Sequence, residues 1–336
     1  MKEHTGQIAT LALYPKGSQQ LRLFALWYFT ALMVAWNIAG HAHLGFEQAW
    51  AVPFVAVLAA CAAQIVLEWA DARATGRAPR YSGGFLNFVN FLPPAIISGF
   101  ACAMLLYPGD RLWPFAFAAT VSIASKVLIR VKLSDGRSTH LFNPSNIGIV
   151  ITLLLLPSVG QAPPYHFTEN VVGIWHWVIP GAIMLTGIIV HGFATGRLPL
   201  CIAWLATFVL QGVFRAWMAG DFDHWYVPLT PMSSAGFILF TLYMIPDPAT
   251  TPVAPLRQIL FGASVAIAYG VLQYNHIVYG LFLALVLVCA VRGLMIVSRR
   301  RLLKSGAADL PRTGQLLTRS GALEESVAMP EPATAS

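Results

Sequence analysis

The stretch 230–253, TPMSSAGFILFTLYMIPDPATTPV, sets the organisation of this chain. It opens with a proline and a cluster of small residues, continues as one apolar run and ends at Asp247-Pro248. Pro cannot continue a helix from within, but Asp followed by Pro makes a favourable N-cap and N1 pair for a new helix. The stretch therefore predicts that one membrane-length helix ends here and another begins.

An earlier stretch, PPAIISGFACAMLLYPGD, resembles it at a distance of about 137 positions. The matching pairs are Pro94 with Pro231, Gly99 with Gly236, Phe100 with Phe237, Leu105 with Leu242 and Asp110 with Asp247. Chance identity between two apolar runs is one explanation. Duplicated halves are common in membrane proteins, however, and the matches include Pro and Gly at membrane depth, so we expect an internal repeat.

The composition predicts an all-α integral membrane protein. Of 336 residues, 57% are hydrophobic and 10% are charged, where a soluble protein carries about 25% charged residues. No cleavable signal peptide is expected, since the first apolar run is long enough to stay as an anchor. The expected spans, about ten, are 22–40, 48–69, 85–107, 112–132, 144–157, 173–193, 198–218, 230–246, 257–274 and 277–297.

Positive charge is unequally divided between alternate loops. The loops on the side of the N-terminus, with the tail, hold Arg73, Arg77, Arg80, Arg130, Lys132, Arg137, Arg197, Arg257, Arg292, Arg299, Arg300, Arg301, Lys304, Arg312 and Arg319. The opposite loops hold Arg111 and Arg215 with Glu47, Glu169, Asp221 and Asp223. The positive-inside rule then predicts a multi-pass inner (plasma) membrane protein with both termini in the cytoplasm. The net charge of +7 is explained by this bias and does not indicate nucleic-acid binding.

This topology predicts two inverted five-helix halves. The third and eighth spans run in opposite directions and lie five spans apart, so two halves of odd count must be inverted. We expect a cytoplasmic segment at 1–20, a membrane domain at 21–297 with halves at about 21–157 and 173–297, and a disordered cytoplasmic tail at 298–336. Such folds place a ligand or cofactor near mid-membrane, between Gly- and Pro-interrupted segments of the two halves.

Few polar groups lie at positions where they could carry chemistry. Asn143 can cap a helix that starts at Pro144, and such an end can receive an anion, although a plain loop-to-helix junction explains it too. Lys126 lies within the fourth apolar run, where a functional role and snorkelling are both open. Ser98, Ser233 and Ser234 can line a site or simply let helices approach closely.

Metal and hydrolytic chemistry have weaker signals. Cys61, Cys102, Cys201 and Cys289 each lie in a different apolar run, which favours plain buried cysteine over a disulfide or an iron–sulfur cluster. The histidines near the predicted outer face are His41, His43, His166, His176, His224 and His276. They are better explained as interfacial residues than as haem or metal ligands, so no metal site is predicted. The sequence has no phosphate-binding Gly-rich loop and no readable nucleophile–base pair, so no catalytic residue is predicted.

Three segments resemble the RnfD/NqrB family of membrane subunits. SKVLIRVKLSDGRSTHLFNPSNIGIVITLLLLP is similar to its Lys-containing helix, loop and Phe-Asn-Pro signature. LTPMSSAGFILFTLYMIPDPATTPVAPLRQILFGASVAIAYGVL is similar to its later helix, Asp-Pro motif and following helix, and AIISGFACAMLLYP to its third helix. The similarity covers most of residues 85–297, and the two Pro motifs are fairly specific in combination.

The resemblance implies ten helices in inverted halves and a flavin, as in subunits of Rnf and sodium-pumping NADH:quinone oxidoreductase complexes. It marks Lys126, Asn143, Pro144, Asp247 and Pro248 as signature positions. The family attaches FMN covalently through a Thr after the fifth helix, but the segment PSVGQAPPYHFTENVVG lacks the Ser-x-Ala-Thr type of sequence and offers only Thr168. Covalent FMN is therefore not expected, and both a noncovalently bound flavin, FMN or riboflavin, and a role without flavin stay open.

The first functional hypothesis is a membrane electron-transfer subunit, a component of an oxidoreductase complex in the bilayer with other electron-transfer subunits as partners. The residues predicted to hold its cofactor are Lys126, Asn143, Ser145, Ser233, Ser234, Asp247 and Thr250. The second hypothesis is a transporter or channel for a small solute or metabolite, including one associated with natural-product biosynthesis. A third is a structural membrane partner of a biosynthetic enzyme.

Overall fold

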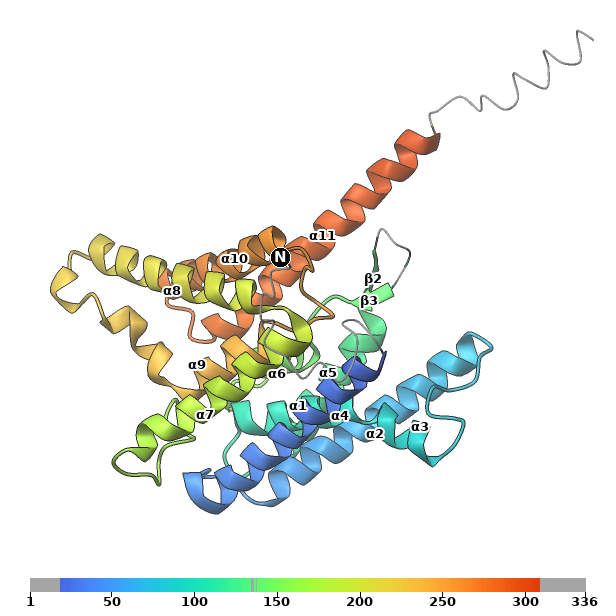
Figure 1. The fold of residues 1–336 in the computed structure, drawn as a ribbon, viewed down its shortest axis with the longest axis horizontal. Helices are drawn as coiled ribbons and strands as arrows, with labels where there is room; N and C mark the ends of the chain where they lie inside the picture. Colours follow the sequence, from blue (N-terminus) through green and yellow to red (C-terminus); the bar gives the residue numbers. More distant parts are fainter. Residues whose placement is uncertain (1–18, 134–135, 137, 309–336) are drawn as a thin grey trace, which may run out of the picture. The chain divides into compact units, whose positions relative to one another are not determined.

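The computed structural model describes residues 19–133, 136 and 138–308, and these are mainly helical (Figure 1). In the first half the helices are α1 (Gln19–Ala39) with the π-turn η1 (Gly40–Leu44), α2 (Ala51–Ala74), α3 (Phe85–Phe91), α4 (Pro93–Leu105), α5 (Trp113–Leu128) and α6 (Pro144–Leu155). Pro93 and Pro94 interrupt the third apolar run, so α3 and α4 are separate helices.

The second half follows with α7 (Trp175–Ile189), the π-turn η2 (Val190–Thr195) and α8 (Leu198–Met218). The eighth apolar run is divided most: the 3₁₀ turns η3 (Phe222–His224) and η4 (Val227–Ser233) precede α9 (Ala235–Leu239) and the π-turn η5 (Phe240–Met244). α10 (Pro255–Tyr274) and α11 (Gly280–Ala308) complete the described chain. The predicted tail at 298–336 is thus helical as far as Ala308, and residues 309–336 lie outside the described ranges.

Two short antiparallel ribbons join loops. β1 (Leu106–Tyr107) pairs with β4 (Gly160–Gln161), with Leu106 opposite Gln161. β2 (Arg130–Lys132) pairs with β3 (Ser138–His140), with Val131 opposite Thr139. The second ribbon holds the segment before α6 against the end of α5.

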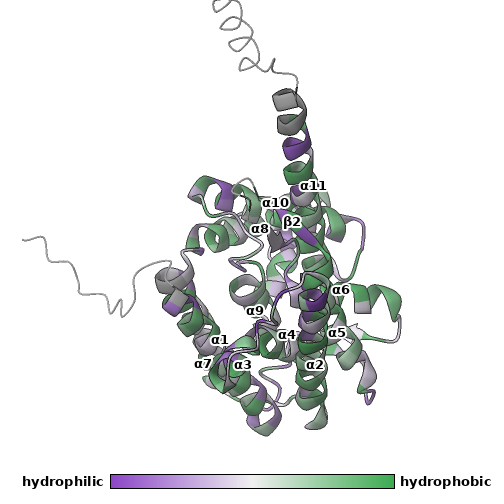
Figure 2. Cartoon of the chain, turned by 90° about the vertical axis from the view of Figure 1, so that its right-hand side faces the viewer, coloured by the Kyte–Doolittle hydropathy of each residue, from purple (hydrophilic) through white to green (hydrophobic). Residues whose placement is uncertain are grey.

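The chain is an all-α integral membrane protein, but the expected ten full-length spans are not confirmed. Among the described residues seven helices, with α3 and α4 counted together as 85–105, are long and apolar enough to cross a membrane, or eight if the pair bent by 68° at 222–244 counts as one. α5 and α6 have 16 and 12 residues, which is shorter than the roughly 20 that a bilayer requires. Figure 2 shows hydrophobic residues along most of the helices.

One pattern of helix contacts occurs in both halves. In the first, α4 packs against α1 and α2, and α2 packs against α5. In the second, α9 packs against α7, η4 and η5 pack against α8, and α8 lies beside α10 (Figure 1). In each half, the third span therefore contacts the first and the second, and the second contacts the fourth. This recurrence supports the expected repeat, while the inversion of the halves across a membrane stays a prediction.

The expected helix start at Pro248 is wrong. α10 begins at Pro255, with Ala254 as its N-cap residue. Asp247 and Pro248 instead open a turn, because the backbone N–H groups of Thr250 and Thr251 both donate to the carbonyl of Asp247. The loop 245–254 between η5 and α10 is called the Asp-Pro loop below.

Candidate cofactor site at the Asp-Pro loop

The start of α6 is capped by Asn143, as the sequence predicts. The Asn143 side-chain oxygen accepts a hydrogen bond from the backbone N–H of Asn146 at 3.1 Å, and Pro144 occupies the first helical turn. The Ser145 hydroxyl donates to the same oxygen at 2.9 Å. Because Pro lacks an N–H and Asn143 accepts two donors, the buried helix end has few unpaired groups.

Asp247 organises the Asp-Pro loop from within. One carboxylate oxygen accepts the backbone N–H of Ala249 at 3.1 Å, and the other accepts the Thr250 hydroxyl at 3.2 Å. The Thr251 hydroxyl donates to the backbone carbonyl of Asp247 at 2.7 Å. This pattern is an Asx-type turn that fixes a proline-bounded loop.

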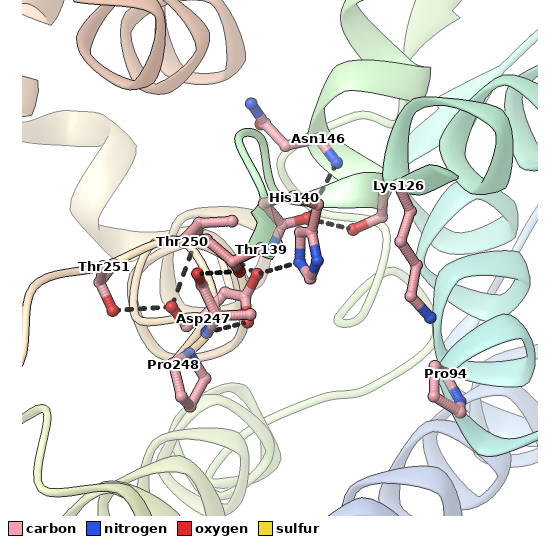
Figure 3. Close-up of polar contacts among 12 residues, drawn as sticks. Pro94, Lys126, Thr139, His140, Asn146, Asp247, Pro248, Thr250 and Thr251 are labelled. Atoms are coloured by element: carbon pink, nitrogen blue, oxygen red, sulfur yellow. Dashed lines mark hydrogen bonds and ion pairs between the residues drawn. The ribbon is translucent and has the colours of Figure 1, made fainter. Parts of the chain in front are cut away.

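The α6 start and the Asp-Pro loop meet, although a hundred residues separate them in sequence. The Asn143 amide donates to the Met244 carbonyl at 2.9 Å, and the Thr139 hydroxyl donates to the Ala249 carbonyl at 2.9 Å. His140 Nε2 lies 3.5 Å from the Asp247 carboxylate (Figure 3). We call this meeting of His140, Asn143 and Asp247, with Asn146 beside it in the first turn of α6, the Asp-Pro junction. It brings together the two Pro motifs that the sequence singled out.

The junction keeps Asp247 ionised. Burial acts to raise the pKa of this carboxyl, but the hydrogen bond and charge of His140, with the Ala249 N–H and the Thr250 hydroxyl, hold its pKa below the ordinary value. The environment of Asp247 therefore suits a structural carboxylate better than a proton carrier at neutral pH.

Asn146 is a member of the junction that the sequence did not select. It is 1% exposed, and its amide donates to the Phe282 carbonyl at 3.0 Å, while its side-chain oxygen Oδ1 has no partner among the described residues. A buried acceptor without a donor is costly, so it marks a place where a ligand or water can donate. Its position in the same Asn-Pro-Ser-Asn motif was the available signal.

Lys126 belongs to a different polar group. Its ammonium donates to the Gln64 side-chain oxygen in α2 at 3.3 Å, and the Gln64 amide donates to the Phe91 carbonyl at 2.6 Å. Figure 3 shows the Lys126 side chain directed away from Asp247. Gln64 thus donates a hydrogen bond to a backbone carbonyl near the proline break between α3 and α4, and it accepts one from Lys126.

Ser233 and Ser234 are not brought to the junction. Ser234 is the N-cap of α9, accepting the Phe237 N–H at 3.1 Å, and the exposed Ser233 donates to the Thr230 carbonyl at 2.7 Å. Both precede α9 and η5, whereas Asp247 follows them, so roughly 15 Å of helix separates them at 1.5 Å per residue. Ser98 donates to the Pro94 carbonyl within its own helix.

The π-turn η5 presents backbone carbonyls to three neighbouring elements. His191 of η2 contacts the Leu242 carbonyl at 2.5 Å, the Cys201 thiol of α8 the Thr241 carbonyl at 3.6 Å, and the Asn143 amide the Met244 carbonyl. In lipid every backbone polar group needs a partner within the protein, and these side chains supply donors where the helix is irregular. π-turns often occur at functional sites.

Two features lie away from the junction. A surface pocket of about 360 Å³ is lined by Glu47, Gln48, Ala49, Val52, Tyr107, Gly109, Asp110 and Leu112, none of which is a predicted cofactor residue. His41 and His166 both pack on Phe46, with ring centroids 5.4 Å and 3.7 Å away. Within the described chain no three His, Cys, Asp or Glu side chains are grouped so that they could hold a metal ion.

No protein-family model and no curated protein matches the chain. The resemblance to the RnfD/NqrB family stays a prediction that depends on the quoted motifs.

Proposed function

We propose that the chain is a membrane electron-transfer subunit that binds a flavin noncovalently at the Asp-Pro junction. The observation that carries the proposal is Asn146 Oδ1 in the first turn of α6 beside the junction, a buried acceptor that has no donor among the described residues. The imide edge of a flavin ring offers an N–H donor between two carbonyl acceptors. A carboxamide is a fitting partner for that edge, since it offers one acceptor and two donors.

The residues of the junction have separable roles in this proposal. Asn146 would orient the ring, Asn143 fixes the start of α6, and Asp247 fixes the loop opposite. Bound flavin supplies one- and two-electron chemistry, while the protein sets its position and surroundings. Ser145 and Thr250 are already hydrogen-bonded to Asn143 and Asp247, so they would support the site rather than contact the ring.

The proposal predicts a coloured protein. The full chain purified in mild detergent should absorb at about 450 nm, as oxidised flavins generally do, and lose that band with dithionite. Asn146→Leu should lower the retained flavin at least about tenfold, because it removes the orienting acceptor. Asn87→Leu, a change at an exposed asparagine of α3, should not.

Colourless wild-type protein that takes up neither FMN nor riboflavin on reconstitution would sink the proposal. Equal flavin retention by the Asn146 and Asn87 variants would show that the ring, if bound, is held elsewhere.

The second candidate is a transporter or channel for a small solute, and the 68° bend within 222–244 is the observation that favours it. Broken helices at the seam of repeated halves are common in alternating-access transporters. Solute uptake into liposomes by flavin-free protein would support this candidate.

We further propose that both termini face the cytoplasm, because of the loop charges, and reporter fusions at each end test this.

A further inference from the structure

One buried and one part-buried guanidinium group contact the Asp-Pro loop, and neither has a carboxylate within salt-bridge distance among the described residues. Arg197, the residue before α8, is 5% exposed and donates from Nη2 to the Pro248 carbonyl at 3.3 Å, while its Nε has no partner among the described residues. Arg292 of α11 is part-buried and donates to the Thr250 carbonyl at 2.5 Å. Both arginines therefore reach carbonyls of the same short loop.

The charges around this loop do not balance. Asp247 is the carboxylate whose charge stabilises Arg197 at a distance. The oxygens of this carboxylate already accept hydrogen bonds from His140, the Ala249 N–H and the Thr250 hydroxyl. Within the described ranges neither Arg197 nor Arg292 has a carboxylate within salt-bridge distance. The buried Glu68 of α2 shows the usual arrangement, because Arg77 and Arg80 both pair with it. Burying a positive charge without a paired anion is unfavourable, so the buried Arg197, with Arg292 beside it on the same loop, favours an anion at this place.

A second unpartnered atom specifies the anion further. Gln258 of α10 is 2% exposed, and its amide donates to the carbonyls of Gly196 and Val253 at 3.1 and 2.9 Å. Its oxygen Oε1 has no partner in the described part of the chain, and its amide lies against the residue that precedes Arg197. Arg197 Nε needs an acceptor and Gln258 Oε1 needs a donor. A phosphate oxygen can accept from Arg197, and a hydroxyl of the same molecule, on free phosphate or on a glycerol headgroup, can donate to Gln258.

We propose that Arg197 and Arg292 bind a phosphate group beside the Asp-Pro loop at the start of α8, with Gln258 Oε1 accepting a hydrogen bond from a hydroxyl of the bound molecule. The forked N–H groups of a guanidinium match the oxygens of a phosphate. The N-terminus of α8 is the positive end of its helix dipole and also favours a negatively charged group. The group comes either from free phosphate or from a phospholipid headgroup. This proposal does not depend on a flavin at the junction.

Thermal unfolding of the purified full chain tests the site, with inorganic phosphate and phosphatidylglycerol as probes and chloride as the ionic-strength control. One of the two probes should raise the Tm of the wild type by about 5 °C at a hundredfold excess over its Kd, and chloride should not. Arg197→Gln and Arg292→Gln should each weaken binding by about tenfold or more. Arg257→Gln, a change at the exposed arginine in the first turn of α10, should leave it unchanged.

The responding probe identifies the source of the group: a response to phosphatidylglycerol alone means a lipid headgroup, and a response to phosphate means a free anion. If Arg197→Gln does not fold, Arg197→Lys keeps the charge but loses the fork, and binding should again weaken. No Tm shift with either probe, or equal shifts in the wild type and the Arg292→Gln variant, would overturn the proposal.

Discussion

The third and eighth apolar elements share a sequence pattern, and both are interrupted helices. They differ in which groups pair the backbone carbonyls near the interruption. The third element breaks at Pro93-Pro94 between two α-helices, and one side chain, Gln64, pairs the Phe91 carbonyl. The eighth breaks at Ser234 and ends in a π-turn, whose carbonyls contact side chains from three other segments. The paired prolines Pro94 and Pro231 thus lie close to the break in each element, and the neighbouring elements decide how the polar groups there are paired.

Packing separates the two elements as well. α4 approaches α2 so closely that a Cβ on Gly99 would lie 2.7 Å from the Val57 Cα. The eighth element packs through rings instead: Phe237 lies 4.7 Å from Phe208 and 5.9 Å from Trp204, centroid to centroid. Small residues allow close backbone approach, whereas aromatic side chains fill a wider gap.

The largest expected effect is at Asn143, which connects the eighth element to α6. Asn143→Ala removes the cap of α6 and the donor to the Met244 carbonyl, so we expect a loss of about 2–4 kcal/mol in the free energy of unfolding. Denaturant unfolding in detergent measures it, with Asn87→Ala as the exposed control. Equal stability of the two variants would mean that the eighth element does not depend on this contact.

Gly99 and Gly236 occupy matched places in the expected repeat and should respond in opposite ways. Gly99→Ala should cost about 1–3 kcal/mol, because its Cβ would collide with the backbone of α2. Gly236→Ala has nothing within 4 Å of the added Cβ and should be neutral or stabilising by up to about 1 kcal/mol. A similar loss in both variants would show that the two elements pack alike after all.

Gln64 tests the pairing at the third element. Gln64→Leu leaves the Phe91 carbonyl and the Lys126 ammonium without this partner, and we expect a loss of about 1–2 kcal/mol. A double-mutant cycle with Lys126→Met should give a coupling of about 0.6 kcal/mol, the average for such bonds in membranes. Zero coupling would place the Lys126 ammonium in the lipid headgroups rather than on Gln64.

Adjacent serines provide the smallest and most closely matched test. Ser234→Ala removes the cap of α9 and should cost about 1 kcal/mol, while Ser233→Ala changes an exposed hydroxyl and should cost almost nothing. Thermal unfolding of the two variants side by side is sufficient. The reverse order would show that Ser233, not Ser234, caps α9.

The sequence predicted what periodicity and capping chemistry determine. Hydrophobic runs predicted the helices and the membrane class, and the Asn-Pro pair predicted the start of α6. It failed at Pro248, because Asp247 turns its side chain onto the loop and α10 starts only at Pro255. Capping preferences show which residue types favour a helix start. They cannot show which of several nearby prolines begins the helix.

The site was predicted only in part, because its residues meet through long-range contacts. Asn143 and Asp247 were selected from their Pro motifs, and Asn146 and His140 lay inside the quoted segment without being selected. Arg197 and Arg292 were counted as loop and tail charges, since nothing local distinguishes a buried arginine from an exposed one. Ser233 and Ser234 were selected by their place in the repeat, which puts them at the other end of the element from Asp247.

The contacts of η5 determine which part of the molecule is free to move. His191, Cys201 and Asn143 come from η2, α8 and the turn before α6, and each is committed to a different carbonyl. Sliding or rotating η5 would break all three contacts at once. We therefore expect η5 to be held in place relative to these neighbours. We therefore expect bending of the eighth element at Ser234, where the 3₁₀ segment 227–233 joins α9, rather than within η5.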